Sequence, residues 1–130
     1  FLNDPPPYSP CSYGEFPGVL ERYVRDDPVL TLEGAIRKMT SFPASRLGLS
    51  NKKGQLRGIL RPGAQADLVV FDLDRIHDRA TNPFPHTYPF ENYPHRYPEG
   101  IDYVFVNGEL VVAEGEHTAA LPGRVLRHPG

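Results

Sequence analysis

The sequence has 130 residues and a formal net charge of −2, without a basic stripe or a long block of like charge. This charge distribution argues against a nucleic-acid backbone or an anionic membrane surface as a partner. A hydrophobic content of 39%, with 15 prolines and 12 glycines, predicts one domain with a modest core and much extended loop. No apolar run approaches the about 20 residues that span a bilayer, and no signal-peptide pattern is visible, so we expect a cytosolic protein.

Residues 1–15 are rich in proline and in polar turn formers. Because proline fixes φ and removes an amide donor, we predict an ordered loop without a helix or a central strand; disorder is the alternative. Residues 16–49 carry apolar residues at helical spacing and predict a helical unit. We expect Pro17 at the first position of its first helix, Thr31 as the N-cap of the second, and Gly48 after a short third helix.

The composition changes after residue 50, and residues 50–130 predict β-structure. Leu56–Leu60 is a candidate short strand, and Asp67–Phe71 is a strongly apolar one. Residues 101–112 form two β-rich runs that are split by Asn107-Gly108, a dipeptide that favours the type I′ turn of a hairpin. Strands with apolar residues on both faces predict a sheet that is buried on at least one side.

Residues 74–100 form a proline- and aromatic-rich excursion that contains a short duplication, in which residues 93–98 echo residues 84–89. Two copies are too few for a repeat fold, so we expect a polyproline-like surface loop. His86 and His95 hold equivalent positions in the two copies and are the best candidates for a shared ligand. Packing within the loop is the favoured alternative, because no histidine in the chain shows metal-ligand spacing and a zinc site would lack a third ligand.

Cys11 is the only cysteine, which excludes an internal disulfide and a four-thiolate zinc site. No neighbouring base activates this thiol, so we expect a structural cysteine rather than a nucleophile. Asp67 and Asp72 bracket a predicted strand, and Asp74 and Asp78 follow in the loop. Such carboxylates more often end strand pairing and face water than act as an acid–base pair. The residues alone therefore define no complete active site.

Several sequence blocks form a recognisable set when they are taken together: Tyr13–Pro17, Arg22–Arg25, Thr31–Ser41, Ala66–Asp72, Asp78–Thr81, Tyr97–Ile101, Val106–Gly108 and Pro122–Arg127. This set resembles the C-terminal part of the D-aminoacylases, or N-acyl-D-amino-acid deacylases, of the amidohydrolase superfamily. The Ala66–Asp72 and Val106–Gly108 blocks are shared across the superfamily. Arg37–Ser41 and Pro122–Arg127 are more specific to the family, and the resemblance extends over essentially the whole chain.

The resemblance implies an α+β fragment of a larger enzyme. Two or three helices would come from the end of a (β/α)₈ barrel, and the strands would belong to a small composite β-domain. Residues 1–49 would supply the barrel-closing loop and helices, and residues 50–130 the C-terminal share of the β-domain. The family's metal ligands and catalytic aspartate would lie upstream of residue 1, so we expect no catalytic residue, metal ligand or cofactor in this chain, and zinc in the parent enzyme. The loop at the substrate mouth would include Tyr8, Cys11, Ser12 and Tyr13.

The resulting hypothesis is a C-terminal fragment of a metal-dependent N-acyl-D-amino-acid deacylase that is inactive alone. Its partners would be the N-terminal part of the same protein and, for the parent, a small N-acyl-D-amino acid. The alternative is a free-standing β-rich module without catalytic activity that associates with itself or with a partner strand through open sheet edges.

Overall fold

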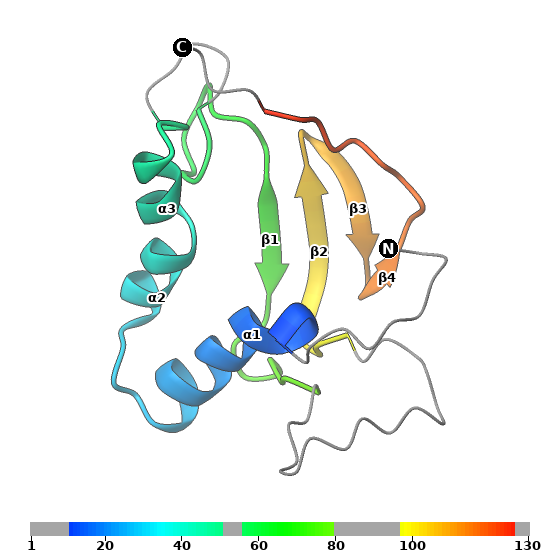
Figure 1. The fold of residues 1–130 in the computed structure, drawn as a ribbon. Coiled ribbons are helices and arrows are strands. Elements are labelled where there is room, and N and C mark those ends of the chain that lie inside the picture. The colour runs from blue at the N-terminus through cyan, green and yellow to red at the C-terminus, as the bar shows by residue number, and fades with distance from the viewer. Residues whose placement is uncertain (1–10, 51–55, 80–96, 127–130) are drawn as a thin grey trace.

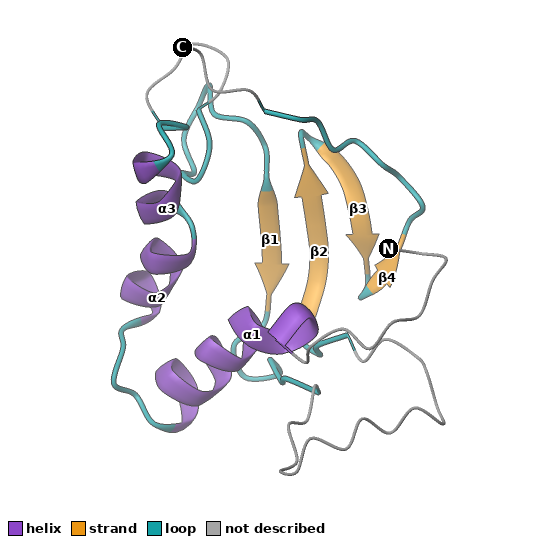
Figure 2. Ribbon diagram, viewed as in Figure 1, coloured by secondary structure: helices purple, strands orange, loops and turns teal. Residues whose placement is uncertain are grey.

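The computed structural model describes residues 11–50, 56–79 and 97–126 of this α+β chain, with helices first and strands after them (Figures 1 and 2). The helical elements are α1 (Cys11–Leu20), the π-helical segment η1 (Glu21–Asp26), α2 (Leu32–Met39) and α3 (Ser41–Arg46). The strands are β1 (Leu68–Phe71), β2 (Ile101–Val106), β3 (Glu109–Ala113) and β4 (Glu116–His117). In Figure 1, α2 and α3 form a column alongside β1, and α1 crosses near one end of the strands.

The start of α1 corrects two expectations from the sequence. The helix begins at Cys11, inside the stretch predicted to contain no helix, and Pro17 lies within it rather than at its first position. Residues 11–16 contain no proline and keep all their amide donors, so the helix can begin before Pro17. Pro17 removes one main-chain hydrogen bond. The burial of Leu20, which is 5% exposed, favours the helix despite this loss.

The second and third helices follow local signals in the sequence. Thr31 caps α2 as predicted, because its side-chain oxygen accepts a hydrogen bond from the amide of Gly34 at 3.1 Å. Ala35 on the inner face of α2 is completely buried. Gly48 follows α3 with a φ of 70°, a conformation that glycine adopts without strain.

The four strands form one antiparallel sheet in the order β1-β2-β3-β4. The predicted hairpin is confirmed, since Asn107 and Gly108 join β2 to β3 with φ values of 52° and 84°. Glu114 and Gly115 make a second left-handed turn into β4, with φ values of 53° and 82°. Val104 pairs with Val69 on one side and with Val112 on the other, so β2 is the centre of the predicted strand set.

The predicted strand at Leu56–Leu60 is wrong, because this segment is a loop. The reason lies at Gly58, which has a φ of 76°. A Cβ atom at this position would lie 2.6 Å from the Cβ of Ala44, so the loop main chain passes close against α3. A residue with positive φ and such a close neighbour does not fit a regular strand.

The core is small and lies where the helices meet the segment after β1. The buried apolar side chains of the described residues are Leu20, Ala35, Ala44 and Ile76. The expectation that the sheet is buried on at least one side is wrong for this chain, because every side chain of β1–β4 is half-buried or exposed. The core cluster packs against Phe71, the last residue of β1, and against Leu73, which follows the strand.

Candidate functional site

Of the residues expected at a substrate mouth, Cys11, Ser12 and Tyr13 form the first turn of α1 instead of a loop. Tyr8 lies outside the described residues, as do His86, His95 and His128. The substrate-mouth role of Tyr8, Cys11, Ser12 and Tyr13 stays a prediction. A shared ligand for His86 and His95 stays a prediction as well.

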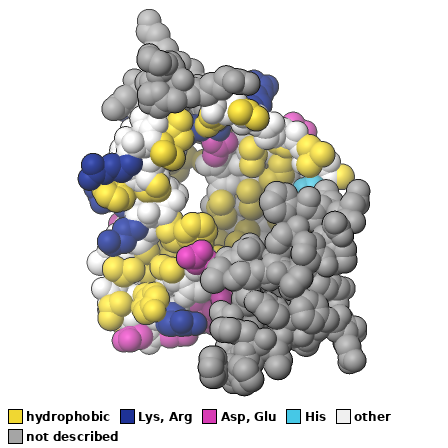
Figure 3. Space-filling model, viewed as in Figure 1, with side chains coloured by type: hydrophobic (Ala, Val, Ile, Leu, Met, Phe, Trp, Pro, Cys, Tyr) yellow, Lys and Arg dark blue, Asp and Glu magenta, His cyan; other side chains and the backbone are white. Residues whose placement is uncertain are grey.

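A groove of about 630 Å³ separates α2 from β1. Figure 3 shows the surface hollowed between the helical column and the sheet, with hydrophobic side chains on both sides. The apolar side chains that line this groove are Leu32, Ile36, Ile59, Leu60, Leu68, Val69 and Phe71. Glu33, Arg37 and Asp67 add charge to the lining. A groove of this composition is suited to covering by apolar side chains of another chain segment.

Strand β1 borders the groove and is open in three directions. It lies at the edge of the sheet, because its only hydrogen-bonded neighbour among the described residues is β2. Val69 and Val70 are 55% and 47% exposed, and consecutive strand residues point to opposite faces. Both faces and one edge of an entirely apolar strand are therefore accessible. An all-apolar strand of this kind is typical of a sheet covered on both sides.

An ionic clasp holds one end of β1 to the β2–β3 turn. The Asp67 carboxylate forms an ion pair with Arg57 and accepts the amide proton of Asn107 at 2.8 Å. Arg57 also donates to the side-chain oxygen of Asn107 at 2.5 Å, and the side-chain amide of Asn107 donates to the carbonyl oxygen of Pro122 at 2.8 Å. The clasp joins the two sequence blocks that contain Asp67 and Asn107. Asp67 therefore has a structural partner and is not a free acid–base group.

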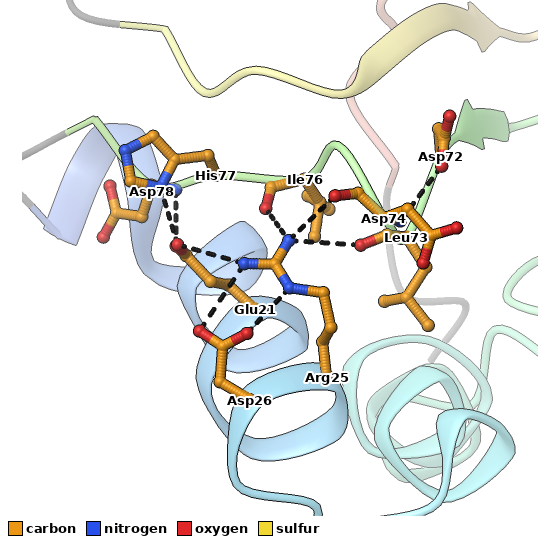
Figure 4. A network of polar contacts seen from close by, with 9 residues as sticks. All are labelled: Glu21, Arg25, Asp26, Asp72, Leu73, Asp74, Ile76, His77 and Asp78. Carbon is orange, nitrogen blue, oxygen red and sulfur yellow. Dashed lines mark hydrogen bonds and ion pairs between the residues drawn. The ribbon is translucent and has the colours of Figure 1, made fainter.

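A second polar network joins η1 to the segment that follows β1 (Figure 4). The Nη1 atom of Arg25 donates to the carbonyl oxygens of Leu73, Asp74 and Ile76 at 3.3, 3.4 and 2.5 Å. The Glu21 carboxylate lies 2.6 Å from Nδ1 of His77 and accepts the amide proton of Asp78 at 2.7 Å. The helical elements are thus fastened to the main chain directly after the sheet's first strand.

The π-helical geometry of η1 explains why this network assembles. The amide of Asp27 donates to the carbonyl oxygen of Arg22, five residues earlier, at 2.9 Å. The wider turn brings residues four and five positions apart to one side of the helix. Glu21, Arg25 and Asp26 therefore share one side, and Arg25 pairs with Glu21 at 3.4 Å and with Asp26 at 2.8 Å.

The pKa values of this network follow from its contacts. Burial alone would raise the pKa of Glu21, but the Asp78 amide, the His77 ring and Arg25 together lower it below 4.5. The hydrogen bond to Glu21 is the main reason that the pKa of His77 is raised above 6.5. The carboxylate is ionised and the imidazolium is stabilised, which is typical of a structural ion pair.

Two of the other predicted carboxylates, those of Asp72 and Asp78, are also engaged in structural contacts. Asp72 binds Arg75 at 2.8 Å, which lowers the pKa of Asp72, and Arg75 reaches Asp102 on β2 at 2.7 Å. The Asp78 carboxylate lies against Gly14 and Gly18 of α1, where a Cβ atom on either glycine would come too close to it. Within residues 11–50, 56–79 and 97–126, no group of three histidine, cysteine or acidic side chains is arranged to hold a metal ion.

The sequence indicated the Asn107-Gly108 turn but not the network around Glu21 and His77. The spacing of Glu21 and Arg25 was visible as an i, i+4 pair. Their partners lie some fifty positions later in the chain, in a segment whose only signal was its position after a strand. Nothing in the local sequence specified the π-turn that brings these residues together.

Comparison with known proteins assigns the chain to a family. Residues 1–112 match the model of the amidohydrolase family, that is, most of the chain. The chain therefore belongs to the amidohydrolase family.

Its relatives include a D-aminoacylase and two N-acyl-D-amino-acid deacylases. It is 42% identical over 125 residues to an N-acyl-D-glutamate deacylase of Alcaligenes xylosoxydans xylosoxydans, and 41% identical over 124 residues to an N-acyl-D-aspartate deacylase of the same organism. These matches cover 96% and 95% of this chain but only 22% of each relative. The chain thus spans less than a quarter of the length of the relatives, a coverage consistent with the expected C-terminal placement.

Solved structures agree with this assignment. A crystal structure of D-aminoacylase superposes with a TM-score of 0.65 at 39% identity, over 81% of this chain and 19% of that one. A D-aminoacylase mutant solved with copper chloride gives a TM-score of 0.71 at 40% identity, over 87% of this chain and 21% of that one. A further D-aminoacylase structure concerns a binuclear metal centre. The small α+β fold thus matches a fragment of the D-aminoacylase fold.

Among the residues whose structure is described, no helix has the length and hydrophobicity that crossing a bilayer requires.

Proposed function

We propose that the chain is the C-terminal part of a metal-dependent N-acyl-D-amino-acid deacylase, an enzyme that hydrolyses the amide bond between an acyl group and a D-amino acid. One observation carries the proposal. The chain is 42% identical to such a deacylase along 96% of its own length while corresponding to only 22% of that protein. Its substrates would be small N-acyl-D-amino acids, and the cytosolic location stays a prediction.

The chemical step would depend on residues outside this chain. The described residues do not fit a metal site, because no three of their possible ligand side chains converge. Zinc, which the resemblance to the family implies, would be held by the remainder of the enzyme. Residues 1–49 would close the barrel and residues 50–130 would contribute to the β-domain, with the proline-rich loop at residues 74–100.

The role of this chain would then be to complete the fold and to bind the rest of the enzyme. The unpaired edge of β1 offers main-chain donors and acceptors to a further strand, and the groove beside α2 offers apolar contacts. A segment of the remaining enzyme that docks in this groove would cover Val69, which is 55% exposed in this chain.

The alternative, a self-associating module without activity, would use the same open strand. The comparisons do not favour it, because every deacylase relative aligns with nearly the full chain. A dimer that buries β1 in the complete natural protein would support this alternative.

We expect the complete natural protein, supplied with zinc, to release free D-amino acid from its N-acetyl derivative. N-acetyl-D-glutamate, N-acetyl-D-aspartate and an apolar N-acetyl-D-amino acid would be assayed beside their L-enantiomers. Hydrolysis of at least one D-substrate, with much slower hydrolysis of its L-enantiomer, is the expected result. A complete protein that is folded and zinc-loaded but hydrolyses none of these compounds would contradict the proposal.

A further inference from the structure

The contact between Glu21 and His77 joins two parts of the chain with different accessibility. The Glu21 side chain is only 16% exposed, whereas the His77 side chain is 55% exposed. Solvent protons can therefore reach the histidine, while the carboxylate is sheltered and accepts hydrogen bonds from His77 and from the Asp78 amide. A change of charge on the exposed His77 ring therefore alters its contact with Glu21, whose carboxylate is sheltered from solvent.

The segment held by this contact is connected in two further directions. The main chain of His77 exchanges two hydrogen bonds with Glu99, at 3.2 and 3.0 Å, in an isolated antiparallel bridge. One residue further on, the Asp78 carboxylate lies against Gly14 and Gly18 in α1. Residues 77 and 78 thus connect η1, α1 and the segment before β2.

We propose that the Glu21–His77 contact is a pH-dependent ion pair that holds the helical elements against the segment after β1. The ion pair is stronger in mildly acidic solution and weaker in alkaline solution. The inference goes beyond the proposed function and does not depend on it.

The direction of the effect follows from the two titrations. The pKa of His77 is raised above 6.5, so its contribution to stability is complete below about pH 6.5 and is lost as the pH rises through the higher folded value. The pKa of Glu21 is lowered below 4.5, so its contribution is present above about pH 4.5 and is lost as the pH falls through the lower folded value. The ion pair is therefore strongest between about pH 4.5 and about pH 6.5.

Other charged groups face His77 and belong in the same account. Those of the described residues are Glu21 and Arg25 on η1, Asp78 beside the ring, and Glu99 across the bridge with its partner Arg79 at 3.3 Å. The acidic groups all favour the protonated ring. The positively charged Arg25 and Arg79 disfavour protonation of the His77 ring, but each is paired with a carboxylate.

The test is amide hydrogen exchange of residues 77 and 78 in the complete natural protein at pH 5.5 and pH 8.5. Each rate is first divided by the intrinsic rate of its own sequence at that pH, and the corrected rate of His77→Gln is then divided by that of the wild type. We expect this ratio to be about threefold at pH 5.5, because an exposed pair contributes little, and to approach one at pH 8.5. His77→Lys, which stays charged at both pH values, should remove the pH dependence.

His117→Gln is the matched control, because the ring of His117 on β4 accepts the amide proton of Ala119 at 3.0 Å instead of facing a carboxylate. Its exchange ratio for residues 77 and 78 should be one at both pH values. A His77→Gln ratio that is the same at pH 5.5 and pH 8.5 would overturn the proposal. A pH dependence that persists unchanged in His77→Lys would overturn it as well.

Discussion

Replacing Gly100 by alanine is expected to destabilise the fold by more than about 3 kcal/mol and to lower Tm by about 10 °C. Gly100 is buried directly before β2 and has a φ of 80°. A Cβ atom there would lie 2.6 Å from the main-chain N and Cα atoms of Ile76, and main chain cannot move away as a flexible side chain can. Ile76 is 1% exposed in the centre of the core, so the clash is transmitted to the packing of Leu20 and Ala35.

Gly63→Ala separates this clash from the cost of backbone conformation. Gly63 has a φ of 86°, close to that of Gly100, but no atom lies within 4 Å of the position that its Cβ would occupy. We expect Gly63→Ala to cost only about 1 kcal/mol, the strain of a left-handed alanine. Thermal or chemical unfolding of both variants measures the difference. Equal losses in the two variants would show that the main chain at residues 76 and 100 is not in close contact.

Replacing Val69 by aspartate is expected to affect the complete enzyme far more than the 130-residue chain alone. In this chain Val69 is 55% exposed, so a charge at this position remains hydrated and should change stability by less than about 1 kcal/mol. If the remaining part of the enzyme covers β1, the same carboxylate becomes buried without a partner in the complete protein. We expect a loss of about 3 kcal/mol or more there.

Val69→Thr provides the matched control, because threonine keeps the branched shape and high strand propensity of valine without a charge. It should cost about 1 kcal/mol in the complete enzyme. Chemical unfolding of both variants, in the complete protein and in the 130-residue chain, gives the comparison. A small effect of Val69→Asp in both forms would mean that β1 is open to solvent in the complete protein too.

The parts of the fold that the sequence predicted depend on local chemistry. Asn107-Gly108 predicts its turn because few residues tolerate positive φ, and Thr31 predicts a helix start because its hydroxyl satisfies a nearby amide. The β-rich composition of Asp67–Phe71 predicts a strand, and β1 occupies Leu68–Phe71.

The parts that the sequence did not predict depend on contacts between distant residues. Pro17 reads as a helix start, yet α1 begins earlier, because packing of Leu20 in the core outweighs one lost hydrogen bond. Leu56–Leu60 has a strand-like composition, but close approach to Ala44 gives it the course of a loop. The site around Glu21 and His77 needs a π-turn and a partner segment some fifty residues away, and neither leaves a pattern in a local window.

The central claim is that this chain completes an amidohydrolase whose catalytic groups lie in the rest of the protein. The most direct measurement is the hydrolysis of N-acetyl-D-amino acids by the 130-residue chain alone, with added zinc, beside the complete natural protein at equal molarity. We predict turnover by the complete protein and none above the buffer blank by the chain alone. Sustained zinc-dependent turnover by the chain alone would contradict the account.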